Sequence, residues 1–136
     1  MKKILVSACL AGFSCRYDGN AMTDPKIIEM VTGGLALPIC PEQLGGLSTP
    51  RPAMEIVGER VLSALGEDFT EKFELGAKET LRIAQEFRCT KAILKSGSPS
   101  CGFGQVYDGS FSNTKTEGMG FTAQLLWENS LEIESK

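Results

Sequence analysis

Three short apolar runs recur along the chain, and each is followed by a loop of small or polar residues. The runs cover 4–6, 35–39 and 91–94. Continuous apolar runs of this length, rich in Ile, Leu and Val, are typical of strands that are buried on both faces of a parallel sheet. The pattern therefore predicts three buried strands.

Helical signals fill the segments between these runs. Asp24 followed by Pro25 is typical of a helix start, and the glycine pair at 33–34 ends that segment. From 70 to 87, apolar or small residues recur every three or four positions, which predicts an amphipathic helix of about five turns. The segment 121–127 predicts a last helix.

The remaining segments predict small additions to this framework. Residues 55–57 and 60–62 flank a Gly-Glu turn and predict a hairpin, and 131–133 predict a short tail strand. Alternating strands and helices predict an α/β fold, a three-layer, Rossmann-like, mostly parallel sheet with a small hairpin insertion. No linker or low-complexity segment divides the chain, so we expect residues 1–136 to form a single α/β domain.

Composition and charge give no indication of a nucleic-acid or membrane partner. The chain has 136 residues, of which 42% are hydrophobic and 23% charged, and its net charge is −3. A mildly acidic chain gives no reason to expect nucleic acid or an anionic membrane surface as a partner. The N-terminus lacks the features of a secretory signal, and no apolar run approaches the ~20 residues of a membrane span, so we expect a cytoplasmic protein.

The histidine and cysteine counts narrow the chemistry further. The chain has no histidine and five cysteines. The absence of histidine excludes Ser–His and Cys–His catalysis and histidine metal ligands, so an acid or base must be Asp, Glu, Lys, Tyr, Cys or water. In a reducing cytoplasm, a cysteine is core filler, a reactive thiol or a metal ligand.

Three of the cysteines follow the three apolar runs. Cys9 follows the first, Cys40 the second, and Cys101 lies just past the third. Because the carboxyl ends of parallel strands share one edge of a sheet, we expect these three thiols to converge there. Cys89, at the end of the long helix, is expected in the core, and Cys15 receives no assignment.

Three converging thiols are compatible with several kinds of site. Structural zinc usually takes a local C-x₂₋₄-C pair, which the chain lacks. An iron–sulfur cluster tolerates dispersed ligands, and three cysteines leave one iron of a cubane with an open position. A metal or cluster site, a thiol redox site and unrelated structural thiols therefore all stay open.

Polar candidates accompany these thiols in the same loops. Glu42 lies two residues after the second cysteine and is either a proton carrier or a helix N-terminal carboxylate stabilised by the helix dipole. Ser98 and Ser100 either hold a polar ligand or cap the next turn. Arg16 either binds an anionic or carbonyl-bearing ligand or pairs with surface carboxylates, and Asp18 is by default a turn residue. We take Ser100, Arg16 and Asp18 as candidate substrate-binding residues.

These loops carry several motifs in a fixed order along most of the chain. The motifs are VSACL (6–10), CRYDG (15–19), CPE (40–42), LGGL (44–47), PR (50–51), SPSCG (98–102) and YDG (107–109). Together they resemble a widespread bacterial family, long catalogued only as a domain of unknown function, whose characterised members are thiouracil desulfidases. The resemblance runs from residue 4 to about 126, so the expected domain is desulfidase-like.

The resemblance implies a specific cofactor and reaction. Enzymes of this family hold a 4Fe-4S cluster by three cysteines, which here would be Cys9, Cys40 and Cys101. The free fourth iron binds the sulfur of a thiocarbonyl substrate, and the C=S bond of a 2-thiouracil-like base is hydrolysed to C=O, without net electron transfer, with release of hydrogen sulfide. By the same match, Glu42 would be the catalytic acid/base and Ser98 a catalytic hydroxyl that assists the substrate or proton transfer.

Two other classes of function stay open beside the enzyme. One is a non-catalytic module that binds a nucleobase or a cluster. The other is a thiol-based sulfur carrier or redox protein that uses Cys9 with Cys15 or Cys101. The predicted partner is a small thiolated substrate, with no nucleic acid and no membrane, and the predicted assembly is a monomer or homodimer.

Overall fold

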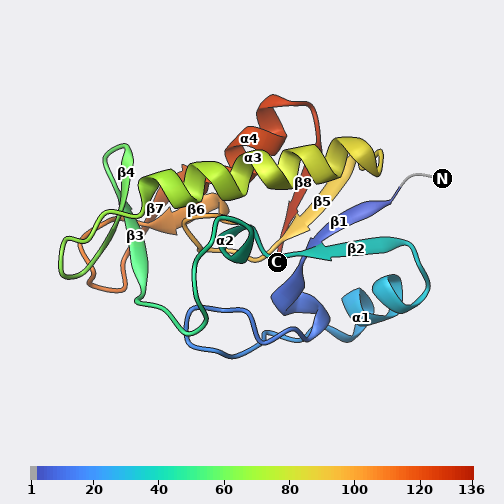
Figure 1. Ribbon diagram of the computed structural model, residues 1–136, viewed down its shortest axis with the longest axis horizontal. Helices are drawn as coiled ribbons and strands as arrows, with labels where there is room; N and C mark the ends of the chain where they lie inside the picture. Colours follow the sequence, from blue (N-terminus) through green and yellow to red (C-terminus); the bar gives the residue numbers. More distant parts are fainter. Residues whose placement is uncertain (1–2) are drawn as a thin grey trace.

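The computed structural model describes residues 3–136; Met1 and Lys2, which the predicted domain includes, lie outside the described residues. Eight strands, four α-helices and one 3-10 helix follow one another along these residues (Figure 1). In chain order they are β1 (Ile4–Ser7), η1 (Ala8–Ala11), α1 (Pro25–Thr32), β2 (Ala36–Ile39), α2 (Pro41–Leu44), β3 (Met54–Val57), β4 (Arg60–Ser63), α3 (Thr70–Glu86), β5 (Lys91–Leu94), β6 (Phe103–Tyr107), β7 (Lys115–Met119), α4 (Phe121–Glu128) and β8 (Glu132–Ser135).

The central sheet has four parallel strands in the order β2-β1-β5-β8. The three apolar runs of the sequence form its first three strands, and the short tail strand adds to β5. The prediction of an α/β fold around a mostly parallel sheet is therefore confirmed. Since all four strands point the same way, the loops after β1, β2 and β5 leave the sheet at one edge.

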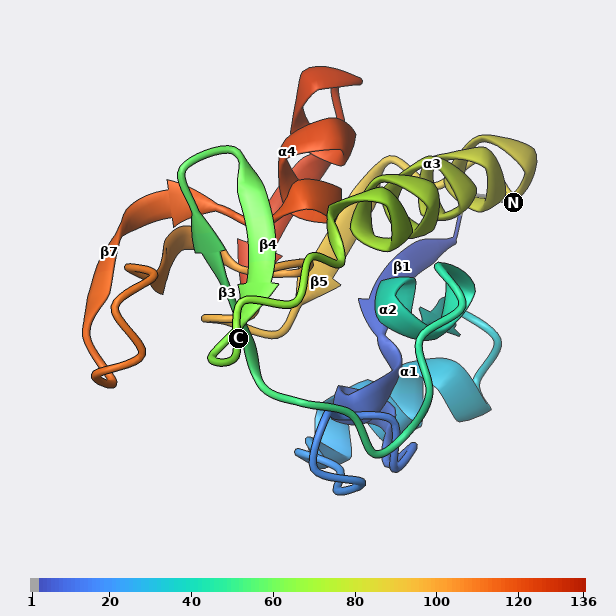
Figure 2. The same ribbon diagram turned by 60° about the vertical axis from the view of Figure 1, so that its left-hand side comes forward.

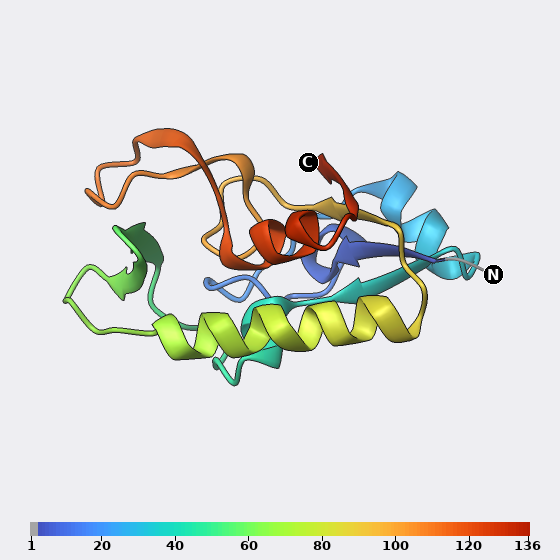
Figure 3. The same ribbon diagram turned by 90° about the horizontal axis from the view of Figure 1, so that it is seen from above.

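Helices cover both faces of this sheet. Leu5 of β1 packs in one core with residues of α3 and α4, including Ala84 and Leu126. Its neighbour Val6 points to the other face and packs with Ile27 of α1. Successive residues of a strand alternate between faces, so a fully apolar strand supports both cores. Figure 3 shows α3 and α1 on opposite sides of β1 and β2, as expected for three layers.

Two antiparallel hairpins extend the fold beyond the sheet. The pairing of β3 with β4 confirms the predicted insertion. The pairing of β6 with β7 was not predicted, because β7 is mostly exposed and lacks an apolar run. Glu55 Oε1 joins the hairpins by accepting hydrogen bonds from the N–H groups of Gly109 at 3.0 Å and Phe111 at 3.2 Å. Figure 2 shows the hairpins side by side, away from α1.

Helices α2 and α3 approach so closely that their contact excludes side chains. A Cβ added to Gly45 would lie 2.1 Å from the carbonyl oxygen of Lys72, and one added to Gly76 would lie 2.1 Å from that of Pro41. A glycine inside a helix lowers the stability of the helix by about 1 kcal/mol relative to alanine. Here the missing side chain allows the two backbones to come into contact. Because Cys40 is the N-cap of α2, this contact also sets the position of Cys40.

No helix within residues 3–136 is long and apolar enough to cross a membrane.

Candidate active site

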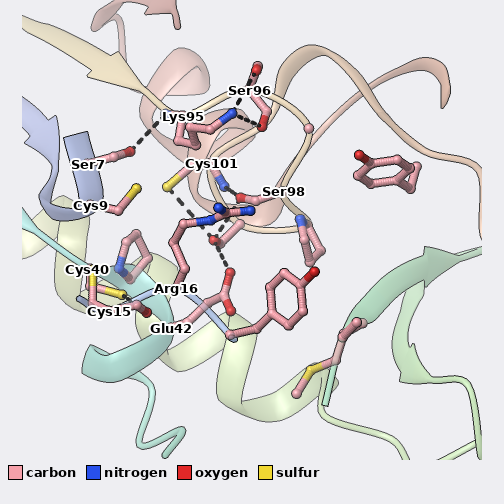
Figure 4. A pocket seen from close by; sticks show the side chains of 18 of the residues that line it. Ser7, Cys9, Cys15, Arg16, Cys40, Glu42, Lys95, Ser96, Ser98 and Cys101 are labelled. Carbon is pink, nitrogen blue, oxygen red and sulfur yellow. Dashed lines mark hydrogen bonds between the residues drawn. The ribbon is translucent and has the colours of Figure 1, made fainter. Parts of the chain in front are cut away.

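A pocket of about 310 Å³ opens at the sheet edge where β1, β2 and β5 end (Figure 4). Its inner wall comes from the loops that follow these strands, and its outer wall comes from the two hairpins. The pocket brings together seven of the eight predicted site residues, which are Cys9, Arg16, Cys40, Glu42, Ser98, Ser100 and Cys101. Predicted site residues up to 92 positions apart (Cys9 to Cys101) therefore share one cavity.

The three predicted ligand cysteines enter this pocket from three different elements. Cys9 lies in η1, directly after β1, and is buried. Cys40 caps the N-terminus of α2 at the end of β2 and is partly exposed. Cys101 is buried in the loop between β5 and β6. The predicted convergence therefore occurs, as the parallel strands require.

A fourth cysteine, Cys15, lies among these thiols. The Cys40 Sγ donates to the carbonyl oxygen of Cys15 at 3.8 Å. The interaction with the Cys40 side chain lowers the pKa of Cys15, but the interaction with Cys9 and burial outweigh it, so that this pKa is raised. Cys15 is buried and lines the same pocket. Cys89 instead lies in the core beneath α3 and α4, which agrees with its expected structural role.

The surroundings give the three predicted ligands different pKa values. A hydrogen bond from Cys15 lowers the pKa of the Cys9 thiol. A hydrogen bond with Cys15, together with burial, raises the pKa of Cys40 well above its ordinary value. Burial raises the pKa of Cys101 to about 12. Cys9 is thus the one predicted ligand whose pKa is lowered, and the positive charge of a bound metal would favour the thiolate form of all three.

The donor set suits an iron–sulfur cluster. Three thiols and no histidine are the soft ligands that such clusters take. Within residues 3–136, no three His, Cys, Asp or Glu side chains gather closely enough to hold a single metal ion. Thiols spread around a cavity match a cluster instead, because a cubane binds each cysteine at a different iron.

Glu42 is held on both of its carboxylate oxygens. Arg51 Nε donates to Oε1 at 2.8 Å, and Ser100 Oγ donates to Oε2 at 2.7 Å. Arg51 is itself buried, and its Nη2 donates to the carbonyl oxygen of Cys15 at 2.8 Å. The guanidinium therefore fixes the carboxylate relative to the loop that carries Cys15.

The hydroxyls of Ser98 and Ser100 form a directed chain to this carboxylate. Ser98 Oγ accepts from the N–H of Cys101 at 2.7 Å and lies 3.2 Å from Ser100 Oγ. Because the single proton of Ser100 points to Glu42, the proton between the two serines belongs to Ser98. The chain therefore runs from Ser98 through Ser100 to Glu42.

The first turn of α4 holds the loop that carries these serines. The N–H groups of Thr122 and Ala123 donate to the carbonyl oxygen of Ser100 at 3.0 and 3.1 Å. A Cβ on Gly120 would lie 2.5 Å from the backbone of Ser100, so only glycine fits there. The loop is thus anchored by a helix that sequence reasoning did not connect to the site.

The remaining two candidates differ in position. Arg16 lines the pocket and lies over the ring of Tyr17, with its Cζ 5.8 Å from the ring centroid. Asp18 does not line the pocket; its Oδ1 accepts from the N–H of Asn20 at 3.0 Å in an exposed turn. The geometry therefore agrees with the turn interpretation of Asp18 and gives it no direct approach to a ligand in the pocket.

Several pocket residues were missed or left undecided. Arg51 stands out in the sequence only as part of the PR motif, and no sequence signal indicates that it is buried. Lys95 could have been found, because it directly follows the third apolar run as Cys40 follows the second. Tyr107 and Lys115 come from the unpredicted hairpin, where Lys115 Nζ lies 5.5 Å from the Tyr107 ring centroid.

Comparison with known proteins places this chain in a family. A family model for 2-thiouracil desulfurase matches residues 4–136. The chain is 43% identical over 143 residues to the uncharacterized protein YbbK of Bacillus subtilis (strain 168), covering 98% of this chain and 95% of that protein. A solved structure of the 4Fe-4S-dependent thiouracil desulfidase TudS is similar with a TM-score of 0.95 and 40% identity, covering 100% of this chain and 91% of that one.

Proposed function

Because the chain belongs to the 2-thiouracil desulfurase family, we propose that it is a 4Fe-4S-dependent desulfidase that acts on a small thiolated base such as 2-thiouracil. The reaction replaces C=S by C=O, consumes one water and releases one hydrogen sulfide, and it needs no electron donor. The observation that carries this proposal is the convergence of three cysteines from three strand ends on one pocket that also holds Glu42.

In this proposal, Cys9, Cys40 and Cys101 hold the cluster. When bound, the cluster supplies an open iron that acts as a Lewis acid toward a soft sulfur atom. The remaining residues of the pocket orient the substrate and move protons.

Glu42 is the proposed proton acceptor for the attacking water. Hydrogen bonds from Arg51 to one oxygen and from Ser100 to the other fix the orientation of its carboxylate. A base held in this way needs no rearrangement before it accepts a proton. Ser98 lies at the outer end of the hydroxyl chain, so a proton lost by a group next to Ser98 can reach Glu42 through Ser100.

Substrate contacts and setting complete the proposal. Ser100 and Arg16 line the pocket and are proposed to contact the base, whereas Asp18 can act only by positioning Arg16, from which it lies 3.9 Å. The chain acts as one domain on a small molecule in the cytoplasm, as a monomer or homodimer without nucleic acid. The net charge of −3 and the five free cysteines support this setting.

The proposal is tested by sulfide release from 2-thiouracil under anaerobic conditions. The wild-type protein should form uracil and hydrogen sulfide in equal amounts. Glu42→Gln keeps the size of the side chain and one acceptor oxygen but removes the base, so it should keep its iron and lose activity by about 100-fold or more. Glu86→Gln, on the exposed face of α3, serves as the control. A colourless wild-type protein that carries a persulfide and releases no sulfide would instead support the sulfur-carrier alternative.

A further inference from the structure

Lys95 is a charged residue of the pocket to which the proposed reaction assigns no role. Lys95 directly follows β5, and its backbone N–H donates to Ser7 Oγ at 2.9 Å. Ser7 ends β1, so this bond ties the Lys95 backbone to the strand end that precedes Cys9. The lysine is therefore a fixed part of the same sheet edge as the ligand cysteines.

The Lys95 ammonium faces the pocket without a carboxylate partner. Its Nζ donates to the carbonyl oxygen of Ser96 at 3.3 Å and to Ser96 Oγ at 3.2 Å. Among the ion pairs of residues 3–136, none includes Lys95. Two weak, neutral hydrogen bonds leave the charge of a partly buried ammonium uncompensated. Such a charge is stabilised when an anion occupies the pocket.

The charges around Lys95 separate it from Glu42. Burial lowers the pKa of Lys95, and the nearby Arg16 and Lys115 cations lower it further, whereas Cys9 and Cys101 raise it when they are thiolates. Glu42 lies across the pocket from Lys95 (Figure 4) and is paired with Arg51. Of the thiols, Cys9 and Cys101 are therefore the ones that interact with the Lys95 charge, and the neighbouring cations are Arg16 and Lys115.

We propose that Lys95 stabilises the negative charge that collects on the sulfur of the substrate as its C–S bond breaks, and that it then holds the hydrosulfide product until release. This inference rests on the proposed function. In the reaction, the water oxygen bonds to the thiocarbonyl carbon and gives one proton to Glu42. As the C=O bond forms, the second proton of that oxygen passes to sulfur, and both electron pairs of the C=S bond go to sulfur, which leaves as hydrosulfide. The Lys95 ammonium donates a hydrogen bond to that sulfur, and Arg16 supplies a second positive charge beside it.

The test compares Lys95→Met with Lys95→Arg in anaerobically purified protein. Lys95→Met should keep its iron content and lower kcat for 2-thiouracil by about 100-fold, with KM changed by less than about threefold, because the lost contact forms only as charge develops. Lys95→Arg retains the charge and should recover at least about tenfold of that loss. Lys78→Met, which removes an exposed lysine from α3, should match the wild type.

A second readout does not depend on turnover. Sodium sulfide added to the iron-loaded protein should bind about tenfold more weakly to Lys95→Met than to the wild type, followed by the visible absorption of the cluster. If Lys95→Met loses iron, Lys95→Gln, which keeps a polar head of similar reach, takes its place in both assays.

The outcomes separate this inference from the proposed function. If the wild type releases no sulfide from 2-thiouracil, the proposed function fails and sulfide binding decides the role of Lys95. If the wild type is active and Lys95→Met keeps kcat within about threefold, or Lys95→Arg is no better than Lys95→Met, the inference on Lys95 is overturned.

Discussion

The two walls of the pocket are built in different ways. The inner wall consists of loops at the ends of β1, β2 and β5, and it carries the thiols, Glu42, the serines and Lys95. The outer wall consists of the hairpins β3–β4 and β6–β7 and carries Met54, Glu55, Tyr107 and Lys115. The inner wall belongs to the two cores of the sheet. The first hairpin of the outer wall packs instead in a separate cluster, through Met54 and Val61 against Phe73 of α3, and hydrogen bonds join it to the second hairpin.

This difference separates the residues that would take part in the reaction from the residues that would select the substrate. The residues that would hold a cluster or transfer a proton lie at the edge of the sheet, where backbone hydrogen bonds and buried partners fix their positions. Groups that meet the far side of a substrate lie on hairpins, which tolerate change without loss of the core. Changes in the inner wall should therefore affect the cofactor and kcat, and changes in the outer wall should affect KM.

The largest effect is expected when a predicted ligand is removed from the inner wall. Cys101→Ser replaces a buried soft ligand with a poor one, so the protein should lose most of its iron and all measurable sulfide release. Cys89→Ser, also buried but placed in the core, should keep its iron. Iron and acid-labile sulfide analysis after anaerobic purification measures both. The reverse pattern would contradict the ligand assignment.

An intermediate effect is expected at the contact that positions the inner wall. In an ordinary helix, glycine to alanine stabilises by about 1 kcal/mol. Gly76→Ala should instead destabilise the protein by about 1–3 kcal/mol, because the new Cβ meets the Pro41 carbonyl oxygen 2.1 Å away. It should also lower kcat, because α2 carries Glu42.

Urea unfolding of the iron-loaded protein measures the change in the free energy of unfolding. Lys78→Ala, an exposed change in the same helix, provides the control. A Gly76→Ala protein more stable than the wild type would show that the contact between α2 and α3 does not constrain the site.

The smallest effect is expected in the outer wall. Glu55→Ala removes the acceptor of two backbone N–H groups in the second hairpin, at Gly109 and Phe111. Loosening this wall should raise KM for 2-thiouracil by about three- to tenfold with little change in kcat, since each such hydrogen bond is worth about 1 kcal/mol. Glu55→Gln keeps one acceptor oxygen and should fall between. Loss of iron in Glu55→Ala would contradict the claim that changes in the outer wall leave the cofactor in place.

The residues of the inner wall could be predicted from the sequence better than those of the outer wall. Buried parallel strands leave long apolar runs, and the residues after them share an edge, so Cys9, Cys40 and Cys101 could be brought together without coordinates. Strand β7 has no such signal, because its residues are largely exposed and include Gly118. Its pairing with β6 depends on backbone hydrogen bonds that any residues can make.

Some features of the site itself also lay beyond the sequence. Arg51 follows a proline in a loop, and arginine is usually an exposed residue. It is buried here because helix α2 and two loops offer it acceptors, including Glu42 and the carbonyl oxygens of Cys15 and Ser48. The direction of the hydroxyl chain from Ser98 to Ser100 follows from the hydrogen bond that Ser100 donates to Glu42, a residue 58 positions away in the chain. Neither arrangement leaves a local pattern in the chain.

The central claim is that this pocket hydrolyses a thiocarbonyl without electron transfer. The most direct measurement is turnover of 2-thiouracil in ¹⁸O-labelled water, with anaerobically purified protein and no reductant. The account predicts uracil with one labelled oxygen per molecule formed and an equal amount of hydrogen sulfide. A requirement for an electron donor, or uracil whose new oxygen is unlabelled, would contradict it.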